Sequence, residues 1–72
     1  FRPRTDIASL TERQRQVLDL LMTGATNKEI AARLVISEAT AKLHILHILR
    51  ALGASNRTEA AIIAQRFLAG EA

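Results

Sequence analysis

The chain has 72 residues, of which 49% are hydrophobic, so it can build one small globular domain with a modest core. It has no cysteine, which excludes a disulfide framework and a thiolate metal site, and its apolar runs are too short to cross a membrane. Ten Lys and Arg against seven Asp and Glu give a formal net charge of +3. The sequence pI of about 10.7 lies in the range that is typical of nucleic-acid-binding domains.

The first nine residues, FRPRTDIAS, show no apolar period and no secretory leader. We expect residues 1–9 to be a linker or tail from a connection to an upstream domain, and residues 10–70 to form the folded domain. Since the first residue is Phe1 rather than Met, the chain is expected to be a fragment of a longer protein.

The first helix is predicted from Glu12 to about Thr23. Thr11 and Gln14 have the spacing of a capping box, in which each side chain bonds the backbone N–H of the other residue. Gly24 can adopt a left-handed conformation and so ends the helix. One apolar stripe at helical spacing forms its buried side: Leu10, Val17, Leu18 and Leu21.

A short helix, a tight turn and a longer helix are predicted between Thr26 and Leu52. Thr26 and Glu29 repeat the capping-box spacing, and the first of these two helices buries Ile30, Ala31 and Leu34. Val35 and Ile36 fill the turn, and a positive φ at Val35 would strain the backbone. A unit of this size can lay its second helix in the major groove of DNA.

Ser37 is predicted to cap the longer helix, which covers Glu38–Leu52 and stops at Gly53. Helical spacing separates its residues into two sets. The core set is Ala41, Ile45, Ile48, Leu49 and Leu52. The outward set is Ala39, Lys42, Leu43, Leu46, His47 and Arg50.

A last helix is predicted from Arg57 to about Ala69, opened by Asn56 and Glu59. It carries two apolar stripes, although one is enough to dock it on the core, so the other is expected to mark a partner site. With no strand pattern elsewhere, the fold is predicted to be all-α with four helices. One stripe is Ala60, Ile63, Ala64 and Phe67, and the other is Ala61, Ile62 and Leu68.

The ordered motif from Leu10 to Ala64 resembles the LuxR/FixJ-type helix-turn-helix domain, the DNA-binding output module of many bacterial regulators. The residues that carry the resemblance keep the order and spacing of that family. They are Leu10-Thr11, Arg13, Val17-Leu18, Leu21, Gly24, Asn27-Lys28-Glu29-Ile30-Ala31, Leu34, Ile36-Ser37, Thr40, Lys42, His44-Ile45, Leu49, Leu52-Gly53, Asn56-Arg57 and Glu59-Ala60. Four positions depart from the usual family residues: Gln14, Ala41, Leu46 and Ala51. The last two make the third helix less basic than usual.

The resemblance implies sequence-specific binding of double-stranded DNA, with the third helix in the major groove and a homodimer formed partly by the fourth helix. The base-facing residues carried over from the family are Lys42, Leu43, Leu46 and His47. The residues expected near the DNA backbone are Thr26, Lys28, Ser37, Thr40 and Arg50, with Arg33 and Arg57 as further cations. The dimer interface is expected at Ala60, Ile63, Ala64 and Phe67.

The chemistry of these side chains is consistent with such a site. Lys42 can donate to guanine, and Leu43 and Leu46 can pack on a thymine methyl group. The two leucines could instead serve internal packing or a protein interface. His44 and His47 could share a metal, but no Cys or acidic cluster completes a site, so we expect no metal and no cofactor. Glu29 and Ser37 fit caps better than catalytic groups.

The chain is therefore expected to be a non-enzymatic, cytoplasmic DNA-binding domain that binds no membrane and no small molecule, on the bacterial nucleoid when bound. It would be the C-terminal effector domain of a transcription regulator, most simply a two-component response regulator. Two alternatives stay open from the sequence. One is a protein-interaction or dimerisation module on the same fold, and the other is the promoter-binding region of a sigma factor.

Overall fold

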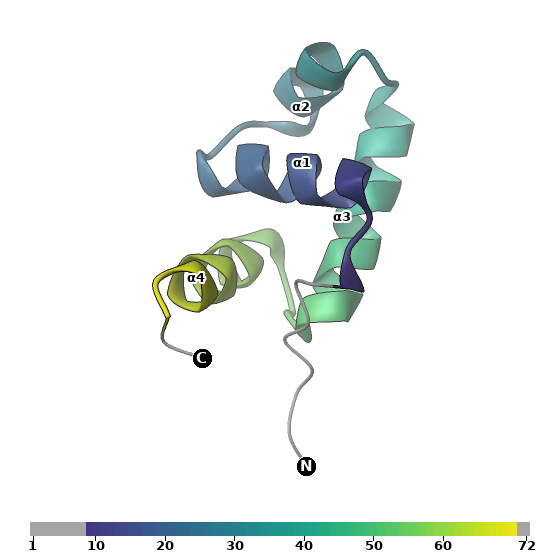
Figure 1. Cartoon of the computed structure of the whole chain (residues 1–72). Helices are drawn as coiled ribbons and strands as arrows, with labels where there is room; N and C mark the ends of the chain where they lie inside the picture. The colour runs from purple at the N-terminus through teal and green to yellow at the C-terminus, as the bar shows by residue number, and fades with distance from the viewer. Residues whose placement is uncertain (1–8, 71–72) are drawn as a thin grey trace.

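The computed structural model of the chain describes residues 9–70, which form four helices joined by short loops (Figure 1). No strand occurs among these residues, so the predicted all-α class is confirmed. The predicted tail over residues 1–9 lies outside the described part of the chain, apart from Ser9. The helices are α1 (Glu12–Met22), α2 (Asn27–Leu34), α3 (Glu38–Leu52) and α4 (Arg57–Leu68).

The helix starts are fixed by side-chain caps, as the sequence predicted. In α1 the Gln14 backbone N–H donates to the Thr11 hydroxyl oxygen over 3.1 Å, and the Thr11 N–H donates to the Gln14 side chain over 3.0 Å. Gln14 thus completes a capping box with an amide in place of the carboxylate that is usual in such boxes. At α4 the cap is shifted, because Glu59 accepts from the N–H of Ser55 rather than from that of Asn56.

The turn between α2 and α3 is closed by a strained residue. Val35 caps the C-terminus of α2 with a φ of 55°, in the left-handed region that a β-branched side chain rarely adopts. Its side chain is 90% exposed, so no core contact compensates for this backbone strain. The next residue is anchored by its N–H, which donates to the Ala31 carbonyl over 3.0 Å.

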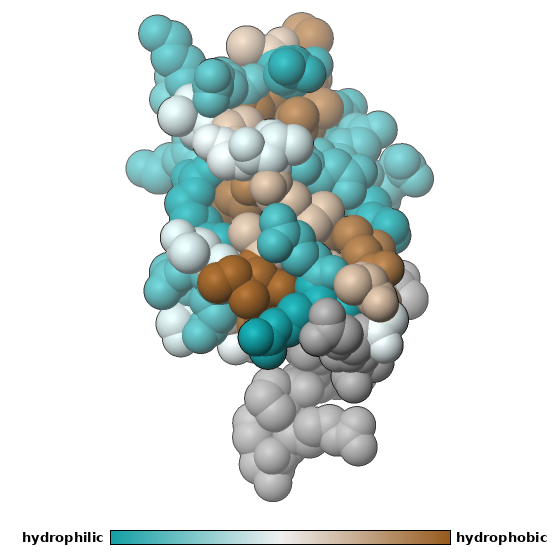
Figure 2. All heavy atoms as spheres, turned by 90° about the vertical axis from the view of Figure 1, so that its left-hand side faces the viewer, coloured by the Kyte–Doolittle hydropathy of each residue, from teal (hydrophilic) through white to brown (hydrophobic). Residues whose placement is uncertain are grey.

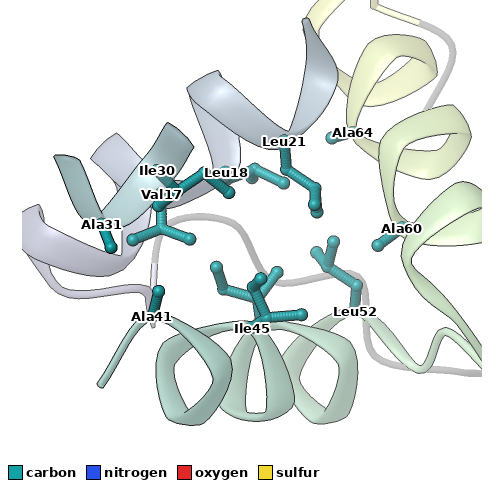
Figure 3. Close-up of a cluster of buried hydrophobic side chains, with 11 residues drawn as sticks. Val17, Leu18, Leu21, Ile30, Ala31, Ala41, Ile45, Leu52, Ala60 and Ala64 are labelled. Atoms are coloured by element: carbon teal, nitrogen blue, oxygen red, sulfur yellow. The ribbon is translucent and has the colours of Figure 1, made fainter. Parts of the chain in front are cut away.

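The hydrophobic core lies where the inner side of α3 meets the other three helices (Figure 3). In Figure 1, α1 lies between α2 and α4, and α3 runs along one side of all three. Alanines at Ala31 and Ala41 face each other between α2 and α3, which lets the two helices approach closely (Figure 3). The core consists of eleven buried residues: Val17, Leu18, Leu21, Ile30, Ala31, Ala41, Ile45, Ile48, Leu52, Ala60 and Ala64.

The structure corrects the predicted use of the two stripes of α4. Ala60 and Ala64 are fully buried against α1 and α3, and Ile63 packs beside them. These residues of the stripe therefore attach α4 to the core. Ala60 and Ala64 have no surface left for a second subunit, and their assignment to a dimer interface is wrong. The exposed apolar side chains of α4 are instead Ile62, Phe67 and Leu68.

None of the helices within residues 9–70 is long and apolar enough to span a bilayer.

Candidate nucleic-acid interface

The outer side of α3 is open to solvent along its length. Because Ala41, Ile45 and Ile48 point into the core, residues about half a turn away from them around the helix, such as Leu43 and His47, point outward. Leu43 and Leu46 are 52% and 42% exposed. The other outward residues that the sequence predicted are also exposed: Ala39, Lys42, His47 and Arg50. At 15 residues, α3 is about 22 Å long, which suits insertion into a major groove.

The cations on this side are free of acidic partners. One ion pair occurs within residues 9–70, between Arg15 Nε and Asp19 Oδ1 of α1 at 4.0 Å. Neither Lys42 nor Arg50 takes part in an ion pair there. Lys28 at the start of α2 is exposed as well. The positive charges of these side chains are therefore available to an external anion such as a phosphate.

The N-terminus of α3 presents two hydroxyl groups in a fixed arrangement. The Ser37 hydroxyl oxygen accepts from the Thr40 backbone N–H over 3.0 Å, and the same hydroxyl donates to Thr40 Oγ1 over 2.9 Å. Because Thr40 accepts in this pair, its own hydroxyl hydrogen remains to be donated. The start of a helix also carries partial positive charge, which suits a phosphate oxygen.

The N-terminus of α2 is a weaker place for an anion. The Thr26 backbone N–H donates to the Glu29 carboxylate over 2.7 Å, and the Glu29 N–H donates to the Thr26 hydroxyl over 3.1 Å. The backbone N–H of Thr26, its hydroxyl and the nearby Arg33 hold the pKa of Glu29 below its ordinary value of 4.5. The capping carboxylate thus occupies the backbone N–H of Thr26, which leaves less of this helix start free for an external anion.

Arg57 has an internal role that the sequence analysis missed. One guanidinium nitrogen, Nη1, donates to Asn27 Oδ1 over 2.6 Å, and the other, Nη2, donates to the Ala25 carbonyl over 2.7 Å. These half-buried bonds join the first turn of α4 to the start of α2. The structure thus gives Arg57 a role in holding α4 against α2, and its contribution of a cation to the DNA backbone stays a prediction. No local signal could reveal the pair, because Asn27 and Arg57 are 30 residues apart.

Arg13 makes a similar link at the other end of α2. Its Nη1 donates to the Leu34 carbonyl over 3.3 Å, which ties α1 to the last turn before Val35. A cationic side chain at a helix C-terminus also opposes the negative end of the helix dipole. Together, Arg13 and Arg57 fix both ends of α2 to neighbouring helices.

The two histidines of α3 face different surroundings. His47 is exposed on the outer side, whereas His44 is half-buried and its buried Nδ1 has no hydrogen-bond partner. No group of three or more His, Cys, Asp or Glu side chains that could hold a metal gathers anywhere in residues 9–70. The exposed residues on the outer side of α3 thus include the cationic side chains of Lys42 and Arg50 and the apolar side chains of Leu43 and Leu46.

Comparison with known proteins matches most of the chain to one family. Residues 8–64 match the family described as "Bacterial regulatory proteins, luxR family". The chain is 44% identical over 57 residues to the nitrate/nitrite response regulator protein NarL of Escherichia coli (strain K12), an alignment that covers 79% of this chain and 26% of NarL.

Two further relatives match this chain with similar identity and over a similar length. The transcriptional regulatory protein LiaR of Bacillus subtilis (strain 168) is 48% identical over 58 residues, which is 81% of this chain and 28% of LiaR. The CsgBAC operon transcriptional regulatory protein of Escherichia coli (strain K12) is 43% identical over 56 residues, which is 78% of this chain and 26% of that protein. The chain spans about a quarter of the length of these relatives.

The family match and the four-helix architecture agree with the exposed, cation-bearing side of α3. Regulators of this kind are DNA-binding transcription factors and not enzymes. The chain belongs to the luxR family of bacterial regulatory proteins and is a helix-turn-helix DNA-binding domain.

Proposed function

We propose that the chain recognises a specific double-stranded DNA sequence by inserting α3 into the major groove. The observation that carries this proposal is the open outer side of α3, opposite an inner side that is buried in the core. In this arrangement the base edges are contacted by Lys42, Leu43, Leu46 and His47. The phosphates are bound by Thr26, Lys28, Ser37, Thr40 and Arg50.

The different roles proposed for Lys42 and Arg50 follow from their positions on α3. Lys42 lies beside Leu46 on the exposed side of α3, where its ammonium group can donate to guanine O6 or N7. Arg50 lies two turns further along, in the last turn of α3, and is proposed to meet a phosphate there. Phosphate contacts set register and affinity but carry little sequence information.

The experiment begins by selecting bound sequences from a library of random duplexes. Lys42→Ala is expected to lose discrimination between the selected sequence and a scrambled one. Arg50→Ala is expected to weaken both sequences alike and to reduce the salt slope by about one. Equal effects of the two variants on both sequences would contradict the assignment, and so would a salt-independent affinity.

The complete protein is proposed to be a transcription regulator in which this chain is the C-terminal effector domain. The name of one relative, NarL, identifies it as a response regulator, which favours a two-component system over other kinds of sensing. The protein would then act in the bacterial cytoplasm, bound to the nucleoid when active. The family match favours this function over the promoter-binding region of a sigma factor.

Dimerisation through α4 is the second part of the proposal. Ile62, Phe67 and Leu68 leave apolar surface on α4 that the monomer does not cover. Figure 2 shows hydrophobic patches at the level of this helix, within a mostly hydrophilic face of the molecule. A protein-interaction module on the same fold would use this surface together with Leu43 and Leu46. Tight self-association without any DNA binding would favour that alternative.

A further inference from the structure

We infer that the domain recognises the 5-methyl groups of pyrimidines at two adjacent base pairs, so that 5-methylcytosine can substitute for thymine at these positions. This inference rests on the proposed function, since it concerns what α3 contacts once it lies in the groove. It identifies Leu43 and Leu46 as specificity-determining residues.

Neither leucine belongs to the hydrophobic core of the domain. They are absent from the buried core and also from the partly buried side chains that pack against it. About half of each side chain is exposed, on a helix whose inner side already supplies four buried residues. On the side of α3 that is proposed to enter the groove, these exposed leucines are placed to meet the edges of base pairs.

A leucine side chain can satisfy only one feature of a base edge. It has no donor or acceptor, and the C5-methyl group of thymine is the apolar feature that the major groove presents. If a leucine covers an amino, carbonyl or ring nitrogen group instead, that group loses water and gains no partner, which lowers affinity. The side chains thus select for methyl groups and against other edges.

The spacing of the leucines matches neighbouring base pairs. Leu43 and Leu46 are three residues apart, which corresponds to a rise of about 4.5 Å along the helix. Successive base pairs are about 3.4 Å apart, so the two side chains reach adjacent steps of the groove. Ala39 precedes them on the same side and is small, so it does not hold the helix away from the bases.

The chemistry extends the inference from thymine to methylated cytosine. 5-Methylcytosine carries its methyl group on the same ring carbon as thymine and differs at the neighbouring exocyclic group. Leu43 and Leu46 form no hydrogen bond with that group, so they distinguish the two bases poorly while they distinguish both from unmethylated cytosine. Binding of this domain should therefore respond to cytosine methylation within its site.

The test removes single methyl groups from a selected duplex. Each thymine of the half-site is replaced in turn by deoxyuridine, which deletes the methyl group and keeps every hydrogen-bonding group. Affinity is expected to fall about fourfold at each of two adjacent positions and to stay unchanged elsewhere. Replacing the same thymine–adenine pair by cytosine–guanine should lower the affinity. Methylation of that cytosine at C5 should then raise the affinity about fourfold over that for the unmethylated duplex.

Matched variants assign each methyl group to one leucine. The deoxyuridine effect at one position should vanish in Leu43→Ala and the effect at the other in Leu46→Ala, because each variant removes the apolar partner. Glu12→Ala, which truncates an exposed side chain on α1 outside both proposed binding surfaces, should leave both effects intact. Thermal unfolding of the variants confirms that these exposed substitutions keep the fold.

Two outcomes would overturn the inference. Sequence-specific binding that is indifferent to deoxyuridine at every position would refute methyl recognition while leaving the proposed function intact. Deoxyuridine effects that persist in both leucine variants would assign the methyl contact to other residues, and lost self-association in those variants would assign the leucines to a protein interface. Failure to select any sequence would overturn the proposed function and the inference together.

Discussion

Val35 occupies a left-handed conformation at the corner of the helix-turn-helix unit, and its side chain projects into solvent. For an L-residue other than glycine, this conformation costs about 1–2 kcal/mol, and a β-branched side chain fits it least well. Nothing in the structure explains why valine stands at this corner. The residue lowers stability without contributing a core contact, and it lies next to the helix that is proposed to enter the groove.

Val35→Asn is expected to stabilise the domain by about 1 kcal/mol, because asparagine tolerates the left-handed region and keeps more order in the unfolded chain than glycine. Urea unfolding monitored by circular dichroism measures the change. Ile62→Asn serves as the control, since it replaces an exposed apolar residue in regular helix and should not stabilise. An equal gain in both variants would show that removal of exposed apolar surface, rather than relief of backbone strain, is responsible.

The position of α2 depends on side-chain links that bind its ends to α1 and α4. Arg57 bonds Asn27 and the Ala25 carbonyl at the start of α2, and Arg13 bonds the Leu34 carbonyl at its end. The helix is only eight residues long, too short to be stable by itself. These links, together with burial of Ile30 and Ala31, keep α2 at a fixed angle to α3.

Arg57→Ala is expected to lower the free energy of unfolding by about 1–3 kcal/mol, because it leaves the half-buried Asn27 oxygen and Ala25 carbonyl without their donor. Arg66→Ala removes the same charge from an exposed position of α4 and should change stability by less than about 0.5 kcal/mol. Chemical unfolding of both variants gives the comparison. If the two losses were equal, the charge of α4 and not the link to α2 would account for the effect.

The capping box of α2 predicts an acid-sensitive component of stability. The pKa of Glu29 is lower in the folded chain than its ordinary value of 4.5, so the carboxylate stabilises the fold above that pH. The contribution falls as pH drops through the folded pKa, where the carboxylate becomes protonated in both states. Melting temperatures between neutral pH and the acid range should therefore decline less steeply for Glu29→Gln.

Glu12→Gln is the control for this pH dependence, because Glu12 lies in the first turn of α1 but takes no part in its capping box. Its acid profile should follow that of the parent chain. A flattened profile for Glu12→Gln, with an unchanged one for Glu29→Gln, would contradict the role given to the cap of α2.

Local features of the chain allowed the helices and the outer side of α3 to be predicted. Capping residues act within four positions of each other, and the spacing of Ala41, Ile45 and Ile48 defines the inner side of one helix. The Arg57–Asn27 bond could not be predicted in this way, because it depends on how two distant helices meet. The docking side of α4 was also ambiguous, since both of its stripes are apolar and only packing shows that the alanines face inward.

The whole molecule presents two surfaces with different chemistry. The outer side of α3 carries Lys42 and Arg50 among apolar side chains, whereas the uncovered surface of α4 is apolar at Ile62 and Leu68. A dimer formed through α4 would place two copies of α3 on one DNA. Helix-turn-helix dimers generally bind half-sites spaced by about one turn of the duplex, 34 Å or a multiple of it.

Ile62→Glu is expected to weaken dimerisation on DNA, because it places a charge where a second copy would bury apolar surface. The affinity for a two-fold symmetric site should fall toward that for a single half-site, while half-site affinity stays unchanged. Ile62→Leu keeps the apolar surface and should retain the parent behaviour. Gel-shift titrations on both sites measure this, and an unchanged preference for the symmetric site in Ile62→Glu would exclude this residue from the contact.

The separation of α3 into an inner and an outer side has an evolutionary consequence. Folding depends on Ala41, Ile45, Ile48 and Leu52, and target choice is proposed to depend on residues that alternate with them. Mutations at the outer positions can accumulate without loss of the native state, so duplicated genes can diverge toward new operators through single steps.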